Sequence, residues 1–325
     1  MTLSLLQRLY AWGLALDRAL TRAHRLPVPV VSVGNIAVGG RGKTPFVIWL
    51  ARGLQARGYA PVVLTRGYGR RSRLPVVLLD PATASAEETG DEALEIGWLA
   101  RVPVLVGAER LLNAQHWLAT QASKSSAPSL SQRTVFLLDD GFQHWKLARD
   151  FDLVLTDPSD ARDGLLPSGR LREWPEALRR ASLVLERGRD FQKISRLRRL
   201  PPTGEALVLT TRAPDKTYLP SLQALVGSVA LRLVELSDHA EGAAAERRLA
   251  REPAGLPLLL GAKEAVKLLA PGAQAEFFRE AFVPAGRSGL GRDVYGVELE
   301  LELRGEDRIW AALLPALAAR GTGIA

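Results

Sequence analysis

A glycine-rich segment that ends in lysine and threonine is the part of this chain whose residue types most clearly predict chemistry. It reads AVGGRGKT. In such a turn, backbone N–H groups converge on phosphate oxygens. Here Lys43 can reach the β- and γ-phosphates, and the Thr44 hydroxyl can ligate Mg²⁺. The strict motif has Gly where this chain has Ala37, so the match is to its relaxed form. The residues predicted to line this phosphate-binding loop are Ala37, Val38, Gly39, Gly40, Arg41, Gly42, Lys43 and Thr44.

The segments on either side of this loop have the patterns that a phosphate site requires. An apolar, β-branched run from Val28 to Val33 precedes it and predicts a strand. The run from Phe46 to Leu54 predicts a helix whose N-terminus points at the phosphates. A glycine turn that binds nothing is the alternative, and the order of strand, loop and helix favours the phosphate site.

Two adjacent carboxylates, Asp139 and Asp140, follow the apolar run Val135 to Leu138. A carboxylate at the carboxyl end of a strand can hold Mg²⁺ or its waters beside a phosphate loop. Paired aspartates are also a common turn signal, but the preceding loop favours a metal site. The next residues, up to and including His144, add polar groups near the same position.

Three further clusters carry groups that phosphoryl transfer uses. Asp91 stands at the predicted start of a helix, where it is either part of an N-terminal cap or a base that takes a proton from an attacking hydroxyl. In the segment LLPSGRLRE, Arg172 could clamp an anion and Glu173 could reach Mg²⁺, although the segment alone reads as a surface loop. His239 follows a predicted strand and could orient a base, whereas a lone histidine is more often structural.

The composition narrows the classes of partner. The chain has 325 residues, 43 basic against 35 acidic, with a net charge of +8 and no cysteine. The positive charge favours an anionic partner, and the lack of cysteine excludes disulfides and thiolate metal sites. We expect no nucleic-acid binding, because the arginines are scattered and no zinc finger or basic-aromatic repeat is present.

Short apolar runs alternate with helical patterns along the first half of the chain. Continuous apolar strands separated by helices predict an α/β fold, with a parallel sheet covered by helices on both faces. The predicted strands there are Val28 to Val33, Val62 to Thr65, Val76 to Leu79, Val104 to Val106, Val135 to Leu138 and Leu153 to Thr156, and the predicted helices are Phe46 to Arg57, Ala93 to Ala100 and Arg110 to Thr120.

A change in composition at Arg196 to Gly204, RLRRLPPTG, predicts a domain boundary. We expect an N-terminal helix over residues 1–22, a phosphate-loop domain over 23–200 and a smaller C-terminal α/β lobe over 201–325. Strands in that lobe are predicted at Leu207 to Thr210, Leu231 to Val234, Leu258 to Leu260 and Val297 to Leu303.

The N-terminal segment has the pattern of a basic amphipathic helix. Its leucines, Tyr10 and Trp12 share one broad face, while Arg8, Arg18 and Arg22 gather on the other. Such a helix could lie in the headgroup region of an anionic leaflet, or it could pack on the protein's own core. No stretch is long and apolar enough to span a bilayer, and no cleavable signal is evident.

Taken together, the motifs resemble those of the tetraacyldisaccharide 4'-kinases, the lipid A 4'-kinases. The similar segments, in chain order, are SVGNIAVGGRGKTP, LTRGYGR, GDEALEIG, VLVGAER, LLDDGFQHWKLARD, LLPSGRLRE, SDH and AKEAVKL. The resemblance implies a P-loop NTPase-like kinase domain that uses ATP and Mg²⁺. It implies transfer of the γ-phosphate to the 4'-hydroxyl of a tetraacyldisaccharide 1-phosphate, which forms lipid IVA, by a peripheral enzyme at the cytoplasmic face of the inner membrane.

The resemblance also implies roles for individual residues. Lys43 and Thr44 would serve the phosphates and Mg²⁺, and Asp91 would be the general base supported by His239. The remaining implied residues are Asp139, Asp140 and Glu173 at the metal, and Arg110, His144 and Arg172 at the substrate. Departures from the family pattern lie mainly in the second half, where Leu236-Ser237 replaces Phe-Pro and Gly261 to Glu264 replaces Thr-Glu-Lys-Asp.

Two other functions stay open from the residues themselves. A phosphate-loop NTPase could couple hydrolysis to a conformational switch, in which case Asp91 and His239 would have no acceptor to serve. A non-catalytic membrane-surface protein could keep the nucleotide fold for structure only. The retention of Lys43, Thr44, Asp91 and the Asp139-Asp140 pair argues against the second.

Overall fold

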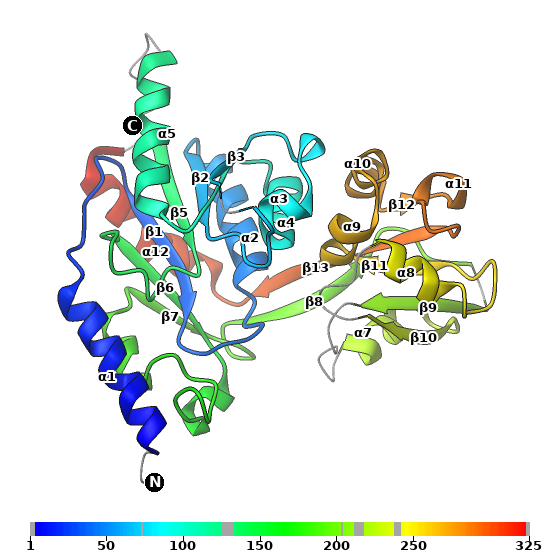
Figure 1. Cartoon of the computed structure of the whole chain (residues 1–325), viewed down its shortest axis with the longest axis horizontal. Coiled ribbons are helices and arrows are strands. Elements are labelled where there is room, and N and C mark those ends of the chain that lie inside the picture. The colour runs from blue at the N-terminus through cyan, green and yellow to red at the C-terminus, as the bar shows by residue number, and fades with distance from the viewer. Residues whose placement is uncertain are drawn as a thin grey trace.

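The computed structural model describes residues 4–72, 74–124, 133–202, 204–210, 218–236 and 242–322. They form two lobes side by side (Figure 1). The first lobe is built on a seven-stranded sheet in the order β3-β4-β2-β5-β1-β6-β7, in which only the edge strand β3 is antiparallel to its neighbour. Its strands are β1 (Val30–Asn35), β2 (Ala60–Thr65), β3 (Val76–Leu78), β4 (Val104–Val106), β5 (Thr134–Asp139), β6 (Phe151–Thr156) and β7 (Leu183–Glu186).

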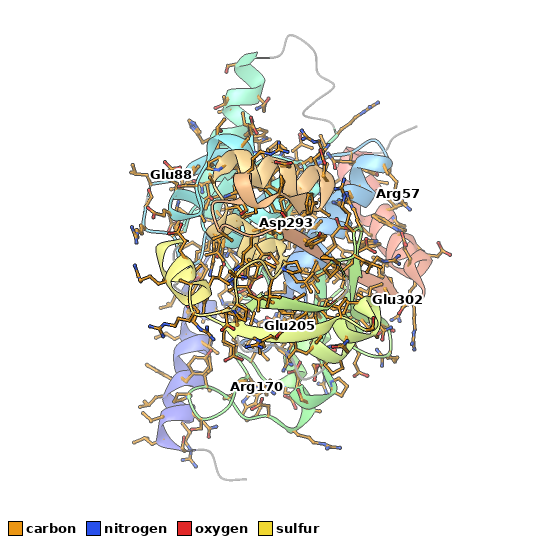
Figure 2. All side chains as sticks on the ribbon, turned by 90° about the vertical axis from the view of Figure 1, so that its right-hand side faces the viewer. Arg57, Glu88, Arg170, Glu205, Asp293 and Glu302 are labelled. Carbon is orange, nitrogen blue, oxygen red and sulfur yellow. The ribbon has the colours of Figure 1, made fainter. Side chains whose placement is uncertain are left out.

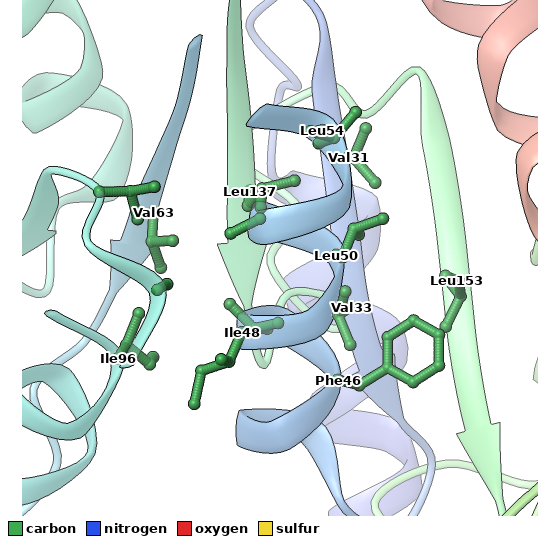
Figure 3. Packing of buried hydrophobic residues seen from close by; sticks show 14 of the residues in the cluster. Val31, Val33, Phe46, Ile48, Leu50, Leu54, Val63, Ile96, Leu137 and Leu153 are labelled. Carbon is green, nitrogen blue, oxygen red and sulfur yellow. The ribbon is translucent and has the colours of Figure 1, made fainter. Parts of the chain in front are cut away.

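Helices cover both faces of this sheet, as predicted. On one face α2 (Lys43–Ala56) points Phe46, Leu50 and Leu54 toward Val31 and Val33 of β1 (Figure 3). The short α3 (Ala86–Thr89) leads into α4 (Asp91–Ala100), which packs beside α2. On the other face α5 (Arg110–Lys124) covers the alternate residues of the strands. Strands buried on both faces read as continuous apolar runs, which is why the sequence located them.

The second lobe is a six-stranded sheet. Its main path is β10-β9-β11-β13-β12, and β8 pairs antiparallel with β13. The strands are β8 (Phe191–Leu197), β9 (Glu205–Thr210), β10 (Ala230–Glu235), β11 (Leu258–Gly261), β12 (Phe282–Val283) and β13 (Val294–Leu303), and the helices are α7 (Tyr218–Val226), α8 (Gly242–Leu249), α9 (Ala262–Leu268), α10 (Pro271–Glu280) and α11 (Ala285–Ser288). Figure 2 looks onto this lobe, with Glu205 of β9 and Asp293 just before β13 near its centre.

Two elements cross the predicted domain boundary near residue 200. Strand β8 lies before it in the sequence but belongs to the second sheet, and the long β8–β13 pair runs between the lobes (Figure 1). Helix α12 (Glu306–Leu317) lies after it but packs on the first lobe, where the Trp310 and Trp49 ring centroids are 5.1 Å apart. The division of the chain into independent domains stays a prediction.

The N-terminal helix α1 (Leu5–Leu20) lies against the first lobe through polar residues (Figure 1). The Gln7 side chain donates to the Leu165 carbonyl at 3.1 Å, and the Tyr10 hydroxyl donates to the Arg172 carbonyl at 3.2 Å. Most of the apolar side chains remain exposed: Leu5, Leu6, Leu9, Trp12 and Leu20 are each more than half exposed. Tyr10 and Ala11 pack against the buried cluster around Phe142, but the exposed leucines and Trp12 do not pack on the core. No helix among the described residues has both the length and the apolar character needed to cross a membrane.

Candidate active site

The phosphate-binding loop connects β1 to α2 at the carboxyl edge of the first sheet. Gly42 caps the helix with φ 88°, in the left-handed region that glycine adopts without strain. The Val38 N–H donates to the Arg170 carbonyl at 2.7 Å, which ties the loop to the segment that carries Arg172. The Arg41 guanidinium is buried and bonds Asp160, with Asp157 at 3.6 Å. Arg41 therefore braces the loop with its side chain.

Asp140 is the centre of a group of cations next to this loop. Lys43 Nζ lies 3.4 Å from Asp140 Oδ1, and Arg172 Nη1 lies 2.7 Å from Asp140 Oδ2. Arg110, also buried, donates to the Asp140 backbone carbonyl at 3.3 Å. Burial acts to raise the pKa of Asp140, but the Lys43 and Arg172 charges outweigh it and hold that pKa below its ordinary value. Because β1 and β5 are neighbouring parallel strands, the loop and this aspartate meet at one edge of the sheet.

Asp139, the last residue of β5, is more deeply buried than its neighbour. Its Oδ2 accepts a hydrogen bond from the Thr65 hydroxyl at 3.0 Å, at the end of the adjacent strand β2. Burial, followed by the charges of Glu92 and Asp140, raises the pKa of Asp139 to about 6. A nearby cation would favour the ionised form of this carboxyl.

Glu173 lies in the same region but is held by other side chains. The Arg180 guanidinium contacts its Oε1 at 2.6 Å, and the Gln143 amide donates to the same oxygen at 2.8 Å. Among the described residues no three His, Cys, Asp or Glu side chains are grouped so that they could hold a metal ion. Thr44, Asp139, Asp140 and Glu173 as metal ligands stay a prediction.

Asp91 is the first residue of α4, and Gly90 is the capping residue. The Asp91 carboxylate is only 11% exposed and contacts two lysines of the second lobe, Lys263 Nζ at 2.9 Å and Lys267 Nζ at 3.4 Å. Burial acts to raise the pKa of Asp91, but the Lys263 charge and then that of Lys267 outweigh it and lower the pKa below its ordinary value. The side chain is therefore a carboxylate at neutral pH, as a proton acceptor must be.

His144 and Arg110 stand near the Asp140 group. Burial, together with the charges of Arg110, Arg149 and Lys146, lowers the pKa of His144 to about 4. The neutral imidazole keeps its Nε2 buried and without a hydrogen-bond partner. His239 lies outside the described residues, in the segment after β10.

Sequence reasoning missed several partners of these residues. Thr65 and Lys267 lie far along the chain from the residues they contact, whereas Arg180 lies only seven residues from Glu173. Lys263 and Lys267 both belong to the segment AKEAVKL, but nothing in the sequence indicated their contact with Asp91. An alternation of apolar and polar residues predicts which elements form, but it does not say which side chains of distant elements meet.

Comparisons with known proteins point to one family. The family model described as tetraacyldisaccharide-1-P 4'-kinase matches residues 1–285. A tetraacyldisaccharide 4'-kinase of Janthinobacterium sp. (strain Marseille) is 45% identical over 172 residues, covering 53% of this chain and 46% of that protein. One of Dechloromonas aromatica (strain RCB) is 44% identical over 181 residues, covering 55% and 51%. The chain spans about half the length of the curated relatives it matches.

A solved structure extends the similarity over the whole fold. A structure of LpxK from Aquifex aeolicus, titled as an apo form in complex with ATP, superimposes with a TM-score of 0.71. The two sequences are 25% identical, and the match covers 96% of this chain and 97% of the other. The similarity therefore includes both lobes.

Proposed function

Because the chain belongs to the tetraacyldisaccharide-1-phosphate 4'-kinase family, we propose that it transfers the γ-phosphate of ATP to the 4'-hydroxyl of a tetraacyldisaccharide 1-phosphate, forming lipid IVA. The observation that carries the proposal is the pairing of Lys43 with Asp140 at 3.4 Å, where the ends of β1 and β5 meet. In phosphate-loop enzymes this juxtaposition places the phosphate-binding lysine beside the metal-binding carboxylate. The loop's relaxed first position, Ala37, is buried and leaves this arrangement intact.

The donor site supplies positioning and positive charge. Lys43, Arg172 and Arg110 surround Asp140, so several cations converge where the transferring phosphate gains negative charge. The donor set of hydroxyl and carboxylate oxygens fits Mg²⁺, which keeps several waters and needs few protein ligands. The buried Asp140 Oδ1 accepts no hydrogen bond, although Lys43 Nζ lies 3.4 Å away, and it is an oxygen that such an ion would use. Thr44, Asp139, Asp140 and Glu173 would hold Mg²⁺, and the ion would neutralise phosphate charge.

The acceptor side of the reaction rests on Asp91. As the sugar oxygen attacks the γ-phosphorus, a new P–O bond forms, the bond from the γ-phosphorus to the bridging oxygen of ADP breaks, and the hydroxyl proton passes to the Asp91 carboxylate. Its carboxylate is ionised and fixed at the interface between the lobes. His239, by the family resemblance, would support this base.

The apolar face of α1 supports a membrane-bound acceptor. Exposed Leu6, Leu9 and Trp12 lie on a helix that also carries Arg8 and Arg18. A helix of this type inserts its apolar face among lipid headgroups and places its arginines on phosphates. We therefore place the enzyme peripherally on an anionic leaflet, at the cytoplasmic face of the inner membrane, where its lipid substrate resides.

The test is transfer of labelled γ-phosphate from ATP to a tetraacyldisaccharide 1-phosphate dispersed in detergent. We expect a labelled lipid product from the natural protein. Lys43→Ala should lose nucleotide binding and transfer together, because the lysine contributes to both. Hydrolysis of ATP without any labelled lipid would refute the proposal and favour the alternative, an NTPase switch without a lipid acceptor.

A further inference from the structure

The proposed base makes its ion pairs with the opposite lobe. Asp91 is carried by α4 of the first lobe, whereas Lys263 and Lys267 stand one helical turn apart on α9 of the second. The two helices pack against each other where the lobes meet (Figure 1). Among the described residues these lysines are the only cations within 4 Å of the Asp91 carboxylate.

The interface around Asp91 contains more acids than bases. Helix α4 also contributes Glu92 and Glu95, and α9 contributes Glu264 between the two lysines. Burial, followed by the charges of Glu264 and Glu92, raises the pKa of Glu95 to about 8, so this carboxyl is protonated at neutral pH. The charged residues of the other two helices on α4 are Lys43 and Arg52 of α2, followed by Arg57 at its end, and Glu87 and Glu88 of α3. Without the lysines, the environment of Asp91 would be dominated by carboxylates.

Burial makes the lysine contacts effective. The side chains of Lys263, Lys267 and Asp91 are 17%, 14% and 11% exposed, so solvent screens their interaction weakly. Lys263 is the nearer of the two lysines and lies at the start of α9. The Ala265 and Leu268 side chains anchor this helix in the second-lobe core. Its position is therefore fixed by the fold of the second lobe.

We propose that Lys263, assisted by Lys267, is a positioning residue of the kinase reaction, which fixes the Asp91 carboxylate at the lobe interface and supplies the charge that keeps it available to accept the acceptor proton. The inference rests on the proposed function of Asp91 as base. A residue of the second lobe thereby sets the position and the charge state of a base in the first lobe. Lys263 itself is assigned no contact with either substrate.

The test is the pH profile of kcat for labelled phosphate transfer by Lys263→Met, Lys263→Arg and Lys267→Met. Removal of an opposite charge within hydrogen-bond distance raises a carboxyl pKa by about 1 to 3 units, so the acid limb of Lys263→Met should move to higher pH by that amount. Lys263→Arg keeps the charge and should restore the limb to near its natural position. Lys267→Met should shift it in the same direction by less, because its contact is longer.

The controls separate this role from a merely structural one. Arg232→Met removes an exposed second-lobe ion pair with Glu205 and should leave the limb in place. In an Asp91→Asn background, Lys263→Met should cause no further loss of rate, since the carboxylate it acts upon is gone. An unshifted acid limb in Lys263→Met, or an additional loss in the Asp91→Asn background, would overturn the inference. Failure of the natural protein to label the lipid would instead refute the proposed function.

Discussion

Individual side chains at this site are tuned by their neighbours. Asp139 and Asp140 are adjacent in sequence, yet burial raises the pKa of the first to about 6, while Lys43 and Arg172 hold the pKa of the second low against the effect of burial. The pKa of Asp91 is likewise held low against the effect of burial, in this case by Lys263 and Lys267. Carboxylates with such different environments can take different roles in one reaction.

Asp91→Asn should lower phosphate transfer about 10²- to 10⁴-fold and leave ATP binding unchanged, because an amide cannot accept the proton. The measurements are labelled transfer at saturating substrate and equilibrium nucleotide binding. Glu87 lies on the neighbouring helix α3 and forms an exposed ion pair with Arg71. Glu87→Gln is therefore the matched control and should retain activity. Transfer at the natural rate by Asp91→Asn would rule out the base assignment.

His144 should make the folded state sensitive to acid. Its pKa is lowered to about 4 in the folded protein, so the unfolded chain takes up this proton at higher pH. The free energy of unfolding should therefore be unaffected by this group above about pH 6.5. It should fall by at most about 3 kcal/mol as the pH drops to about 4.

Chemical unfolding of the natural protein and of His144→Asn between neutral and acidic pH measures this contribution. The free energy of unfolding should fall less steeply with acid in His144→Asn. His116→Asn, at an exposed position on α5, is the control. Parallel pH dependence in the natural protein and His144→Asn would contradict the expectation.

Among the elements, helix α1 is held to the first lobe by a few residues and exposes large apolar side chains on its other side. It is fastened by hydrogen bonds from Gln7 and Tyr10 and by packing of Tyr10 and Ala11, while most of its leucines are exposed. The Tyr10 contact ends on the backbone of Arg172, whose side chain bonds Asp140. Deleting the helix would thus disturb the site as well as any membrane contact, so substitutions on the outer face are the cleaner probe.

Leu9→Glu combined with Trp12→Glu should weaken binding to anionic vesicles by about tenfold or more, because two large apolar side chains can no longer be buried in lipid. Transfer to vesicle-borne substrate should fall more than transfer to detergent-dispersed substrate. Co-sedimentation and parallel assays measure the two effects. Leu112→Glu, an exposed leucine of α5, should change neither. Equal loss of activity in vesicles and detergent would contradict membrane binding by this face.

At the scale of the whole molecule, the chain crosses between the lobes more than once. After completing β13, it returns to the first lobe as α12, where Trp310 packs on Trp49 and the Arg57 guanidinium lies 3.7 Å from the Trp310 ring centroid. Gly53 of α2 admits the indole, since a Cβ there would come within 2.4 Å of it. Helix α12 is therefore part of the first-lobe core that packs on α2.

Trp310→Ala should lower the free energy of unfolding by about 3–5 kcal/mol, the cost of removing a large buried aromatic side chain. Urea unfolding followed by circular dichroism measures it. Leu225→Ala, at a partly exposed position of α7, should cost less than about 1 kcal/mol. A similar loss in both variants would show that α12 is not integral to the first lobe.

The sequence by itself determined the parts whose chemistry is local. Strands buried on both faces, the glycine-rich loop with Lys43 and Thr44, and the aspartates that end β5 each follow from patterns within a few residues. The strands of the first sheet were predicted apart from β7, but α10 and α12 were not, nor was β8, whose half-exposed residues lack a clear alternation.

Only the tertiary structure decided which distant groups meet. It paired Asp91 with Lys263 and Asp139 with Thr65, and it left Leu5, Leu6, Leu9, Trp12 and Leu20 of α1 exposed. The physical reason is that periodicity records whether a side chain is buried, whereas ion pairs and hydrogen bonds depend on the relative placement of whole elements. The residues predicted for the phosphate site could thus be found in the sequence. The charges around them depend on packing, within the first lobe for Asp140 and between the two lobes for Asp91.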